Sequence, residues 1–360
     1  MTAKTYRVIQ WATGKVGQVA IRHFVENPIY ELVGVLVTNP RKVGRDAGAI
    51  AKIADTGVIA TDDVEKILAT DADCVHFAPL MEDIDMVCRL LRSGKNVVSP
   101  LGPFYPTRRY RPQIDRIEAA CQEGKTSFHG SGIHPGFAGD LLPLTMVRAM
   151  NRIDHIHVYE VIDHLANPSH YIQFMGFGRQ PDELLANPSR SPDAPHMFAQ
   201  SMAMVIEALG KSIDDLTTKL EVSTADRDIA YPGGVIKAGT VGGQHYEWTA
   251  WSGGAPIMTF HCFWIMGFAG LTPSWDCGDS GYRVVIEGDP QLHLTLSGPP
   301  LPGGRVRYPG LSLTALLGVN VIPTTCDAPP GVLTHLDFGV VRPHGLIRPA
   351  AATATSPSRA

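Results

Sequence analysis

Residues 11–17 read Trp-Ala-Thr-Gly-Lys-Val-Gly and organise the N-terminal part of the chain. They follow a short β-branched run at residues 7–10 and precede a helical pattern over residues 16–25, so they are expected to form a turn between a strand and a helix. Gly14 lets the backbone come close to a pyrophosphate, and the free N–H groups of the helix face the anion. This pattern predicts a dinucleotide-binding turn; the alternative is an ordinary tight turn, because Ala12 replaces the usual first glycine.

Strand and helix patterns continue to alternate through the first 130 residues. Further strands are predicted at residues 32–37, near 58–59, and at 74–77, 96–98 and 126–129. Helices are predicted from an N-cap at Thr61, over 82–93 and over 109–123. This order predicts an α/β protein that begins with a Rossmann-type, doubly wound parallel sheet.

The pattern changes after Gly130 and predicts an α+β second domain with a mainly antiparallel sheet. Helices are expected over 137–150 and 195–209, and strands over 153–163, 218–224, 234–251, 256–266 and 281–297. The predicted domains are a nucleotide-binding domain (1–135), a substrate and oligomerisation domain (136–310), a segment returning to the first domain (311–342, with a helix at 311–320) and a disordered tail (343–360).

Composition excludes several classes of function. The 31 basic and 35 acidic residues leave no basic excess, so we expect neither nucleic acid nor a membrane surface as a partner. The chain shows no secretory signal and no apolar stretch that would span a membrane, which predicts a cytoplasmic protein. No two of the six cysteines have a C-x-x-C spacing and the histidines are scattered, so we expect reduced thiols and no metal site.

The end of the second predicted strand indicates the type of dinucleotide. It reads Thr38-Asn39-Pro40-Arg41-Lys42, and no acidic residue follows until Asp46. A site for NAD(H) places a carboxylate here to bind the ribose hydroxyls, whereas cations and neutral hydrogen-bonding groups suit the 2′-phosphate of NADP(H). We therefore expect NADP(H) rather than NAD(H); the alternative is that Arg41 and Lys42 are solvated charges at a helix start.

Loops after later strands, at 78–80 and 99–102, are expected to reach the nicotinamide because they lie at the same edge of the sheet. The predicted cofactor-binding residues share this edge and are Ala12, Thr13, Gly14, Lys15, Val16, Gly17, Thr38, Asn39, Arg41, Lys42, Ala78, Pro79, Pro100, Leu101 and Gly102.

Four segments, 10–17, 42–48, 94–98 and 130–137, resemble the dihydrodipicolinate reductase-like superfamily, in the branch of 2,4-diaminopentanoate dehydrogenase and the native amine dehydrogenases. The likeness extends weakly through the second domain, at 174–178 and 320–323. It implies hydride transfer between NADP(H) and a C=N or C=O carbon, with a small-molecule substrate held between the domains.

The resemblance also implies a catalytic glutamate after the fifth strand in the amine dehydrogenases, but residues 99–106 contain no carboxylate. An amine substrate needs a general base and an anionic partner for the iminium. The His-His…Lys arrangement of the biosynthetic reductase is also missing, so diaminopimelate synthesis is not expected. Three functions remain: a reductase or dehydrogenase for a hydrophobic ketone or imine, an NADP(H)-binding sensor or degenerate paralogue without turnover, and an amine dehydrogenase with a relocated base.

A hydride transfer also requires a proton, and three places offer one. His134 lies in a glycine-rich loop at the domain junction, Asp163 and His164 follow the first strand of the second domain, and Tyr105 stands near the vacant glutamate position. Each has a structural alternative as a loop, strand-end or packing residue. Glu160 and Asp140 are expected to be surface or helix-cap residues.

Bulky apolar residues indicate a hydrophobic substrate. The predicted wall of the pocket comprises Tyr171, Phe174, Met175 and Phe177. Further aromatic residues of the second domain, at strand spacing, indicate core or a subunit interface, so we expect a homo-oligomer, either a dimer or a tetramer.

Overall fold

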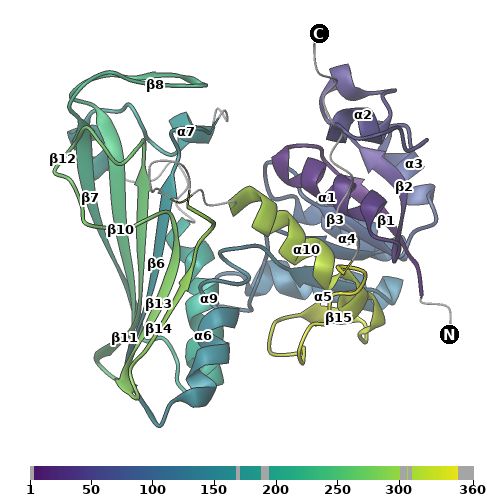
Figure 1. Ribbon diagram of the computed structural model, residues 1–360. Helices are drawn as coiled ribbons and strands as arrows, with labels where there is room; N and C mark the ends of the chain where they lie inside the picture. The colour runs from purple at the N-terminus through teal and green to yellow at the C-terminus, as the bar shows by residue number, and fades with distance from the viewer. Residues whose placement is uncertain (1–3, 168–170, 188–193, 301–305, 307–309, 348–360) are drawn as a thin grey trace.

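The computed structural model describes residues 4–167, 171–187, 194–300, 306 and 310–347, and places two domains side by side (Figure 1). The first contains a six-stranded parallel sheet in the order β15-β5-β4-β3-β1-β2. Its strands are β1 (Tyr6–Trp11), β2 (Tyr30–Leu36), β3 (Cys74–Phe77), β4 (Asn96–Ser99), β5 (Ser127–Gly130) and β15 (Gly331–Leu333). The predicted Rossmann-type architecture is therefore confirmed.

Helices cover both faces of this sheet because its strands are apolar on both sides. Ile9 of β1 packs in one cluster with residues of α4 (Ile84–Arg92) and α5 (Arg111–Gly124). Its neighbour Val8 points the other way, into a cluster with α1 (Lys15–Glu26) and α10 (Gly310–Asp327). The shorter helices α2 (Ala47–Ala51) and α3 (Val64–Ala69) lie between β2 and β3 along the chain.

Two details of the first domain differ from the sequence prediction. The prediction of a strand near 58–59 was wrong, because Ile59 and Thr61 make only isolated bridges. The sixth strand of the sheet is instead β15. Ile59 is 53% exposed, which shows that this short run has no sheet to be buried in. The N-cap of α3 is Asp63, whose side chain accepts the Lys66 N–H, while the Thr61 hydroxyl accepts from Asp63 N–H.

The second domain contains a seven-stranded sheet in the order β12-β7-β10-β11-β6-β13-β14. Its strands are β6 (Arg152–Asp163), β7 (Asp215–Ala225), β10 (Val241–Ser252), β11 (Ala255–Ile265), β12 (Leu271–Thr272), β13 (Gly281–Asp289) and β14 (Leu292–Leu296). All neighbours are antiparallel except β6 and β11, so the mainly antiparallel sheet is confirmed. The predicted strand 234–251 divides into β9 (Gly234–Ile236), which pairs with β8 (Ile229–Tyr231), and β10; the strand 281–297 is the hairpin of β13 and β14.

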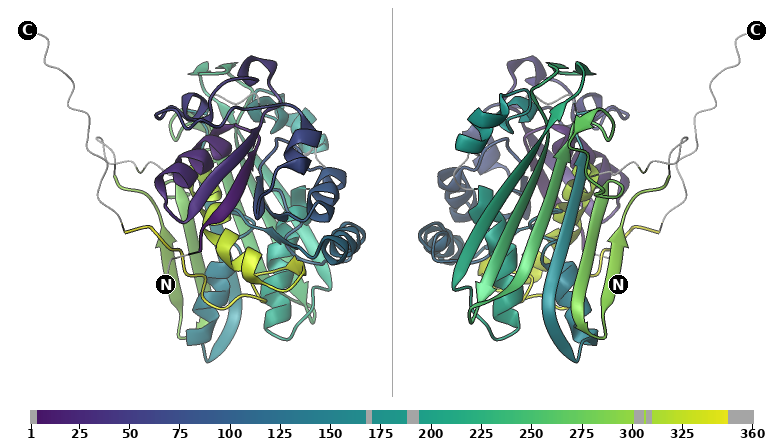
Figure 2. Two further views of the ribbon diagram at one scale, coloured as in Figure 1. Left: turned by 90° about the vertical axis from the view of Figure 1, so that its right-hand side faces the viewer. Right: turned by 90° about the vertical axis from the view of Figure 1, so that its left-hand side faces the viewer.

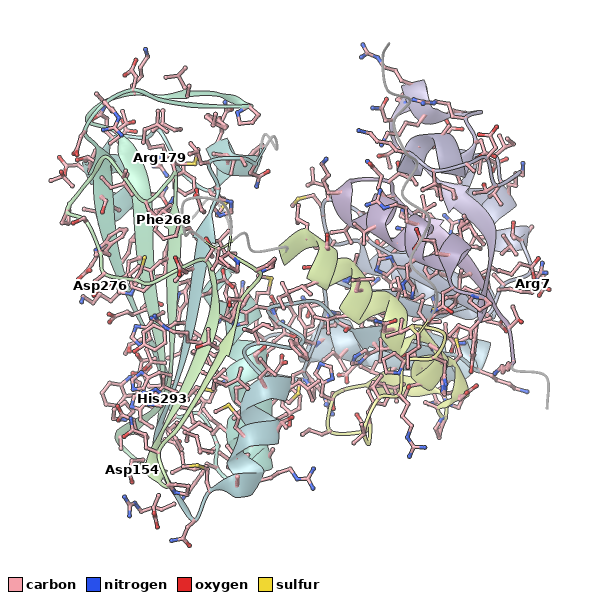
Figure 3. All side chains as sticks on the ribbon, viewed as in Figure 1. Arg7, Asp154, Arg179, Phe268, Asp276 and His293 are labelled. Carbon is pink, nitrogen blue, oxygen red and sulfur yellow. The ribbon has the colours of Figure 1, made fainter. Side chains whose placement is uncertain are left out.

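One face of this sheet is covered by α6 (Leu141–Met146) and α9 (Ala194–Ala208), and among the described residues no helix covers the other face (Figure 2, right). Alternate residues of β6 show the division: Ile156 and Val158 are buried in the helix-covered core, whereas His155 and His157 face the other side and remain half-buried. Figure 3 labels Phe268 and Asp276 on the side away from the helices. We call this side the open face.

The C-terminal segment returns to the first domain, where α10 packs on α1 and β15 extends the sheet beyond β5. Residues 343–347 form neither helix nor strand, and the remainder of the predicted tail, 348–360, lies outside the described residues. Two short helices, α7 (Tyr171–Phe174) and α8 (Pro181–Ala186), follow β6. Among the helices of the described residues, none has the length and apolar character needed to cross a membrane.

Candidate active site

The turn after β1 has the form of a cradle for a dinucleotide. Gly17 lies in the first turn of α1, and a Cβ atom there would be 2.1 Å from the Ala12 carbonyl oxygen, so only glycine allows this helix to approach the strand. A Cβ atom on Gly14, by contrast, would meet nothing within 4 Å. Gly14 therefore borders open space in front of the α1 N-terminus, where a pyrophosphate would meet free N–H groups. Ala12 adopts the left-handed conformation (φ 67°) that the usual first glycine would take without strain.

A buried amide holds this turn in place. The Gln10 side chain is fully buried, and its Nε2 donates to the carbonyl oxygens of Trp11 and Ala12, both at 2.9 Å. Its Oε1 lies 2.8 Å from Nδ1 of His76 in the neighbouring strand β3. Burial lowers the pKa of His76 to about 4, so its imidazole is neutral at neutral pH and donates this hydrogen bond. Neither Gln10 nor His76 carries a sequence motif that would mark this role.

Basic residues gather where β2 ends. Lys42 Nζ donates to the Thr13 carbonyl oxygen at 2.7 Å and lies 3.0 Å from the Thr13 hydroxyl, so Lys42 reaches back to the glycine turn. Burial and the nearby Arg45 lower the pKa of Lys42. Arg41 and Thr38 are exposed beside it, and the Asn39 side chain accepts the Arg41 backbone N–H to cap the 3₁₀ turn 40–42.

The first carboxylate after β2 has a structural role. Asp46 accepts the backbone N–H groups of Gly48, Thr56 and Gly57 at 2.6–2.9 Å, as well as the Thr56 hydroxyl. Although burial opposes its ionised form, these hydrogen bonds hold the pKa of Asp46 below its usual value. The carboxylate therefore ties the loop 46–57 together and does not extend over the glycine turn.

The loops after β3 and β4 meet the same edge of the sheet. Ala78 N–H donates to the Trp11 carbonyl oxygen, and Ala78 and Pro79 are half-buried. After β4, the Leu101 N–H donates to the Ser99 hydroxyl, while Gly102 turns with a positive φ of 81°. Pro100 lies 3.7 Å from the Cβ position of Gly132 in the loop after β5. The loop after β3 is thus joined to the glycine turn through Ala78, and the loop after β4 lies beside the loop after β5; a cofactor role for both loops stays a prediction.

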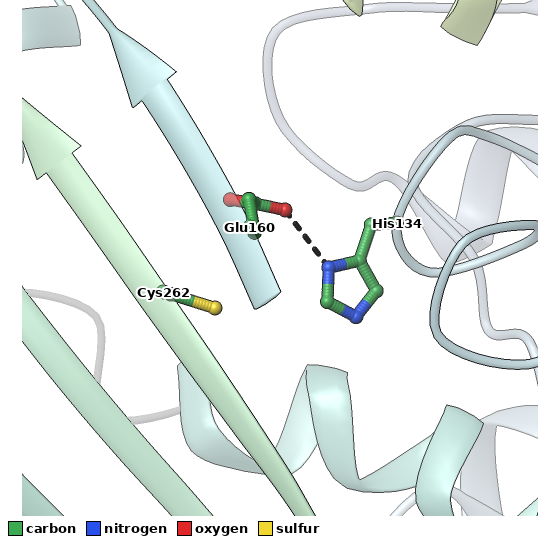
Figure 4. Close-up of side chains that lie close together, drawn as sticks. All are labelled: His134, Glu160 and Cys262. Atoms are coloured by element: carbon green, nitrogen blue, oxygen red, sulfur yellow. Dashed lines mark hydrogen bonds and ion pairs between the residues drawn. The ribbon is translucent and has the colours of Figure 1, made fainter. Parts of the chain in front are cut away.

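His134 lies inside the second domain (Figure 4). Its side chain is inaccessible to solvent, and its ring packs against Phe198, Phe260 and Tyr282, with centroids 4.7, 4.7 and 5.6 Å away. Nδ1 lies 2.8 Å from Glu160 Oε2, and Nε2 makes no hydrogen bond within the described residues. This position anchors the loop after β5 to the second-domain sheet; a catalytic role of His134 stays a prediction.

Glu160 corrects the sequence analysis, which expected a surface or cap residue. It is 3% exposed because its position on β6 faces the helix-covered core. Tyr282 hydroxyl donates to its Oε2 and Trp264 Nε1 to its Oε1, both at 2.6 Å, in addition to His134. Burial opposes the charge, but these donors still bring the pKa of Glu160 below its ordinary value. Asp140 is fully buried as well, and it caps α6 as expected while accepting from the Ser201 hydroxyl.

Tyr105 is bonded to the second domain. Its hydroxyl donates to Glu207 of α9 at 2.7 Å, and burial and this carboxylate raise the pKa of the phenol. The backbone N–H groups of Phe104 and Tyr105 both donate to the Gln200 side chain. The segment without a carboxylate is thus fastened to the second domain by α9.

The side chains of Asp163 and His164 have different partners and do not bond to each other. Asp163 Oδ1 accepts the backbone N–H groups of Leu165 and Gly267, each at 2.9 Å, so it closes the turn after β6. The His164 ring packs beside Phe177 and is 9% exposed, and its Nε2 makes no hydrogen bond within the described residues. Burial lowers the pKa of His164 to about 4, so the ring is neutral at neutral pH.

The predicted pocket wall is divided. Phe174 is 60% exposed, Met175 is half-buried, and Phe177 is buried in a small cluster with Ile172 and Ile236. The side chain of Tyr171 lies outside the described residues. Two hollows of about 310 and 230 Å³ lie beside Tyr6 and Asp327 and beside Ile114 and Val332, and neither is lined by a predicted cofactor or pocket residue.

Comparison with known proteins adds the family. The N-terminus of dihydrodipicolinate reductase matches residues 8–99, and the C-terminal domain of 2,4-diaminopentanoate dehydrogenase matches residues 137–353. An amine dehydrogenase of Streptomyces virginiae is 33% identical over 348 residues, which cover 92% of this chain and 95% of that protein. A 2,4-diaminopentanoate dehydrogenase of Acetoanaerobium sticklandii is 26% identical, covering 72% and 70%. The solved amine dehydrogenase of Mycobacterium smegmatis shares the fold, with a TM-score of 0.79 at 19% identity over 94% of this chain and 97% of that one.

Proposed function

This chain belongs to the dihydrodipicolinate reductase-like family, in the branch of 2,4-diaminopentanoate dehydrogenase and the amine dehydrogenases, and from that membership we propose that it transfers hydride between NADP(H) and the C=O or C=N carbon of a hydrophobic small molecule. The family makes it an oxidoreductase that uses a nicotinamide nucleotide. The choice of NADP(H) and the class of substrate are our proposal.

The end of β2 carries the proposal. Lys42 is held beside Thr13 at the glycine turn, Arg41 is exposed next to it, and Asp46 is committed to backbone N–H groups. A phosphate on the adenosine ribose would meet two cations here, and no carboxylate of this segment would repel it. The nicotinamide would lie against the loops after β3 and β4.

The cofactor choice can be tested by replacing Arg41→Ala and Lys42→Ala separately. Each loses a charge-assisted contact, so the Kd for NADPH is expected to rise about ten-fold or more, while that for NADH changes little. Lys66→Ala, at an exposed α3 site outside the predicted cofactor-binding residues, is the matched control and should leave both constants unchanged. Equal losses for NADPH and NADH would refute the NADP(H) assignment.

The substrate class needs a separate test, because the amine dehydrogenase of Streptomyces virginiae favours a second candidate, an amine dehydrogenase whose base lies outside residues 99–106. NADPH oxidation should be followed with hydrophobic ketones and aldehydes, with and without ammonia. Turnover without ammonia supports a carbonyl reductase, and turnover only with ammonia supports the amine dehydrogenase. NADPH binding without turnover on any carbonyl or imine would support a sensor.

A further inference from the structure

The open face of the second-domain sheet carries a cluster of histidines that plays no part in the proposed hydride transfer. They lie on three neighbouring strands: His155 and His157 on β6, His261 on β11 and His245 on β10. We propose that His245, Glu247 and His261 bind one divalent transition-metal ion, zinc in the first instance.

Strand pairing brings the three side chains together. His245 and Glu247 are two residues apart on β10 and therefore share a face, and Glu247 is directly opposite His261 on the antiparallel strand β11. Glu247 Oε1 lies 3.7 Å from His245 Nε2 and 3.8 Å from His261 Nδ1. The three candidate ligand atoms are all within 4.8 Å of one another.

These distances favour an ion over direct hydrogen bonds. A side-chain hydrogen bond between nitrogen and oxygen does not extend to about 3.6 Å, and both Glu247 contacts are longer than that. Two ligands of a tetrahedral zinc ion, each about 2.0–2.1 Å from the metal, lie about 3.4 Å apart. The observed spacing is therefore close to that of ligands around an ion, and small side-chain rotations would complete it.

The outer hydrogen bonds leave the inner nitrogen atoms free to bind. Glu221 Oε2 lies 3.4 Å from His245 Nδ1, so the ring proton belongs on Nδ1 and the lone pair on Nε2. On the other side, His157 Nδ1 lies 3.1 Å from His261 Nε2, and a proton on that Nε2 leaves the lone pair on Nδ1. Histidine ligands in metal sites are oriented by this kind of partner on their second nitrogen.

The site is also preorganised. His245 is 7% exposed, its ring is stacked on Phe263 at 3.8 Å, and its Nε2 makes no hydrogen bond within the described residues. Burial lowers the pKa of His245, and burial with the neighbouring histidines lowers that of His261 to about 3. Both rings are therefore neutral at neutral pH, the form that binds metal. Lys219 lies 3.9 Å from the other oxygen of Glu247, Oε2, and so does not occupy the ligand position.

A second group of side chains also has the spacing of metal ligands: His134, Glu160 and Cys262 (Figure 4). Its carboxylate already accepts hydrogen bonds from His134, Trp264 and Tyr282. An ion there would have to displace these donors inside a closed core, whereas Glu247 Oε1 faces two unprotonated nitrogen atoms at a half-exposed position. Imidazole and carboxylate ligands suit zinc, and cobalt is its spectroscopic substitute.

The test uses the full-length chain without a histidine tag, freed of metal by chelation, and titrated with Zn²⁺ by calorimetry. We expect one ion per chain. His245→Ala and His261→Ala should each weaken zinc binding about 100-fold or more, because each removes a ligand. Glu247→Gln should weaken it about ten-fold or more, because the amide that replaces the carboxylate carries no charge. His155→Ala is the matched control on the same face, since His155 bonds Thr259 and is no ligand; it should bind as the parent does.

A second measurement begins with the parent chain. The visible spectrum of the Co²⁺-loaded parent chain should show ligand-field bands without a thiolate-to-cobalt charge-transfer band. Absence of saturable binding, unchanged affinity in a His245→Ala/His261→Ala double variant that keeps its circular dichroism, or a thiolate band that disappears in Cys262→Ser would each overturn the proposal. Because NADPH binding is read separately, failure here would leave the proposed redox function standing.

Discussion

Two glycines of one turn have different physical roles. No side chain fits at position 17, because the Ala12 carbonyl oxygen occupies the place of a Cβ atom. At position 14 a side chain has open space in the free protein and would meet only a bound ligand. Gly17→Ala should therefore lower the free energy of unfolding by about 1–3 kcal/mol, the usual cost of overpacking, and impair cofactor binding with it. Urea unfolding followed by fluorescence measures the change.

Gly14→Ala is the complementary substitution. Since Gly14 has an ordinary φ of −66° and open space at its Cβ position, the variant should unfold at nearly the same urea concentration as the parent. Its affinity for NADPH should nevertheless fall at least ten-fold, because the methyl group takes the place of the pyrophosphate. Full affinity in Gly14→Ala would show that the dinucleotide lies elsewhere.

The buried carboxylate of Glu160 makes a pH-dependent contribution to stability. Its pKa is lowered in the folded chain, so its stabilisation is present above the unfolded pKa of about 4 and is lost as the pH falls through the folded value. Glu160→Gln should cost about 3 kcal/mol at pH 7, because three donors lose a charged acceptor. The gap between parent and variant should narrow below pH 4; a gap that is constant with pH would contradict this.

At the residue scale, the sequence could predict features that depend on residues close together in the chain. The glycine turn and the basic end of β2 lie where the pattern placed them. The surroundings of Glu160 could not be foreseen, because its three donors come from positions 134, 264 and 282 and are brought together only by the tertiary fold. Alternation along β6 did place Glu160 in line with Ile156 and Val158, and that was the one available signal.

At the scale of elements, α10 is held to the first domain by a specific hydrogen bond as well as by apolar packing. The buried Tyr30 hydroxyl donates to the Val319 carbonyl oxygen at 2.6 Å. Tyr30→Phe should cost about 1 kcal/mol and speed amide hydrogen exchange in α10. Tyr231→Phe, in the distant β8, is the control and should change neither quantity. Unchanged exchange in α10 would mean that packing alone fixes this helix.

Strands with clear apolar runs were predicted nearly to the residue, as Cys74–Phe77 shows. Pairing was not predictable, because it depends on partners far away in sequence. Residues 58–59 are β-branched but make only an isolated bridge within the part of the chain that the structure describes, whereas the three-residue β15 becomes a strand because β5 offers it an edge. For the same reason scattered histidines gave no ligand spacing, although the register of β10 and β11 sets His245, Glu247 and His261 beside each other.

At the scale of the whole molecule, the open face predicts self-association. Its half-buried aromatic and histidine side chains form a continuous set of stacked rings, including His157, Tyr159 and His261. We expect a homo-oligomer in light scattering coupled to size exclusion. Val285→Arg, on the open side of β13, should shift the mass towards the monomer, whereas Val25→Arg on exposed α1 should not. A monomeric parent chain would remove this prediction.

The return of the chain through α10 and β15 has a consequence for biosynthesis. Because the parallel sheet receives its outermost strand from residues 331–333, the sheet of the nucleotide-binding half cannot be completed until those residues have left the ribosome. The second domain, inserted between β5 and α10, can meanwhile assemble its own sheet from consecutive residues. The same arrangement joins the two halves through two separate chain connections, one after β5 and one before α10, so neither half can separate from the other as a freely tethered unit.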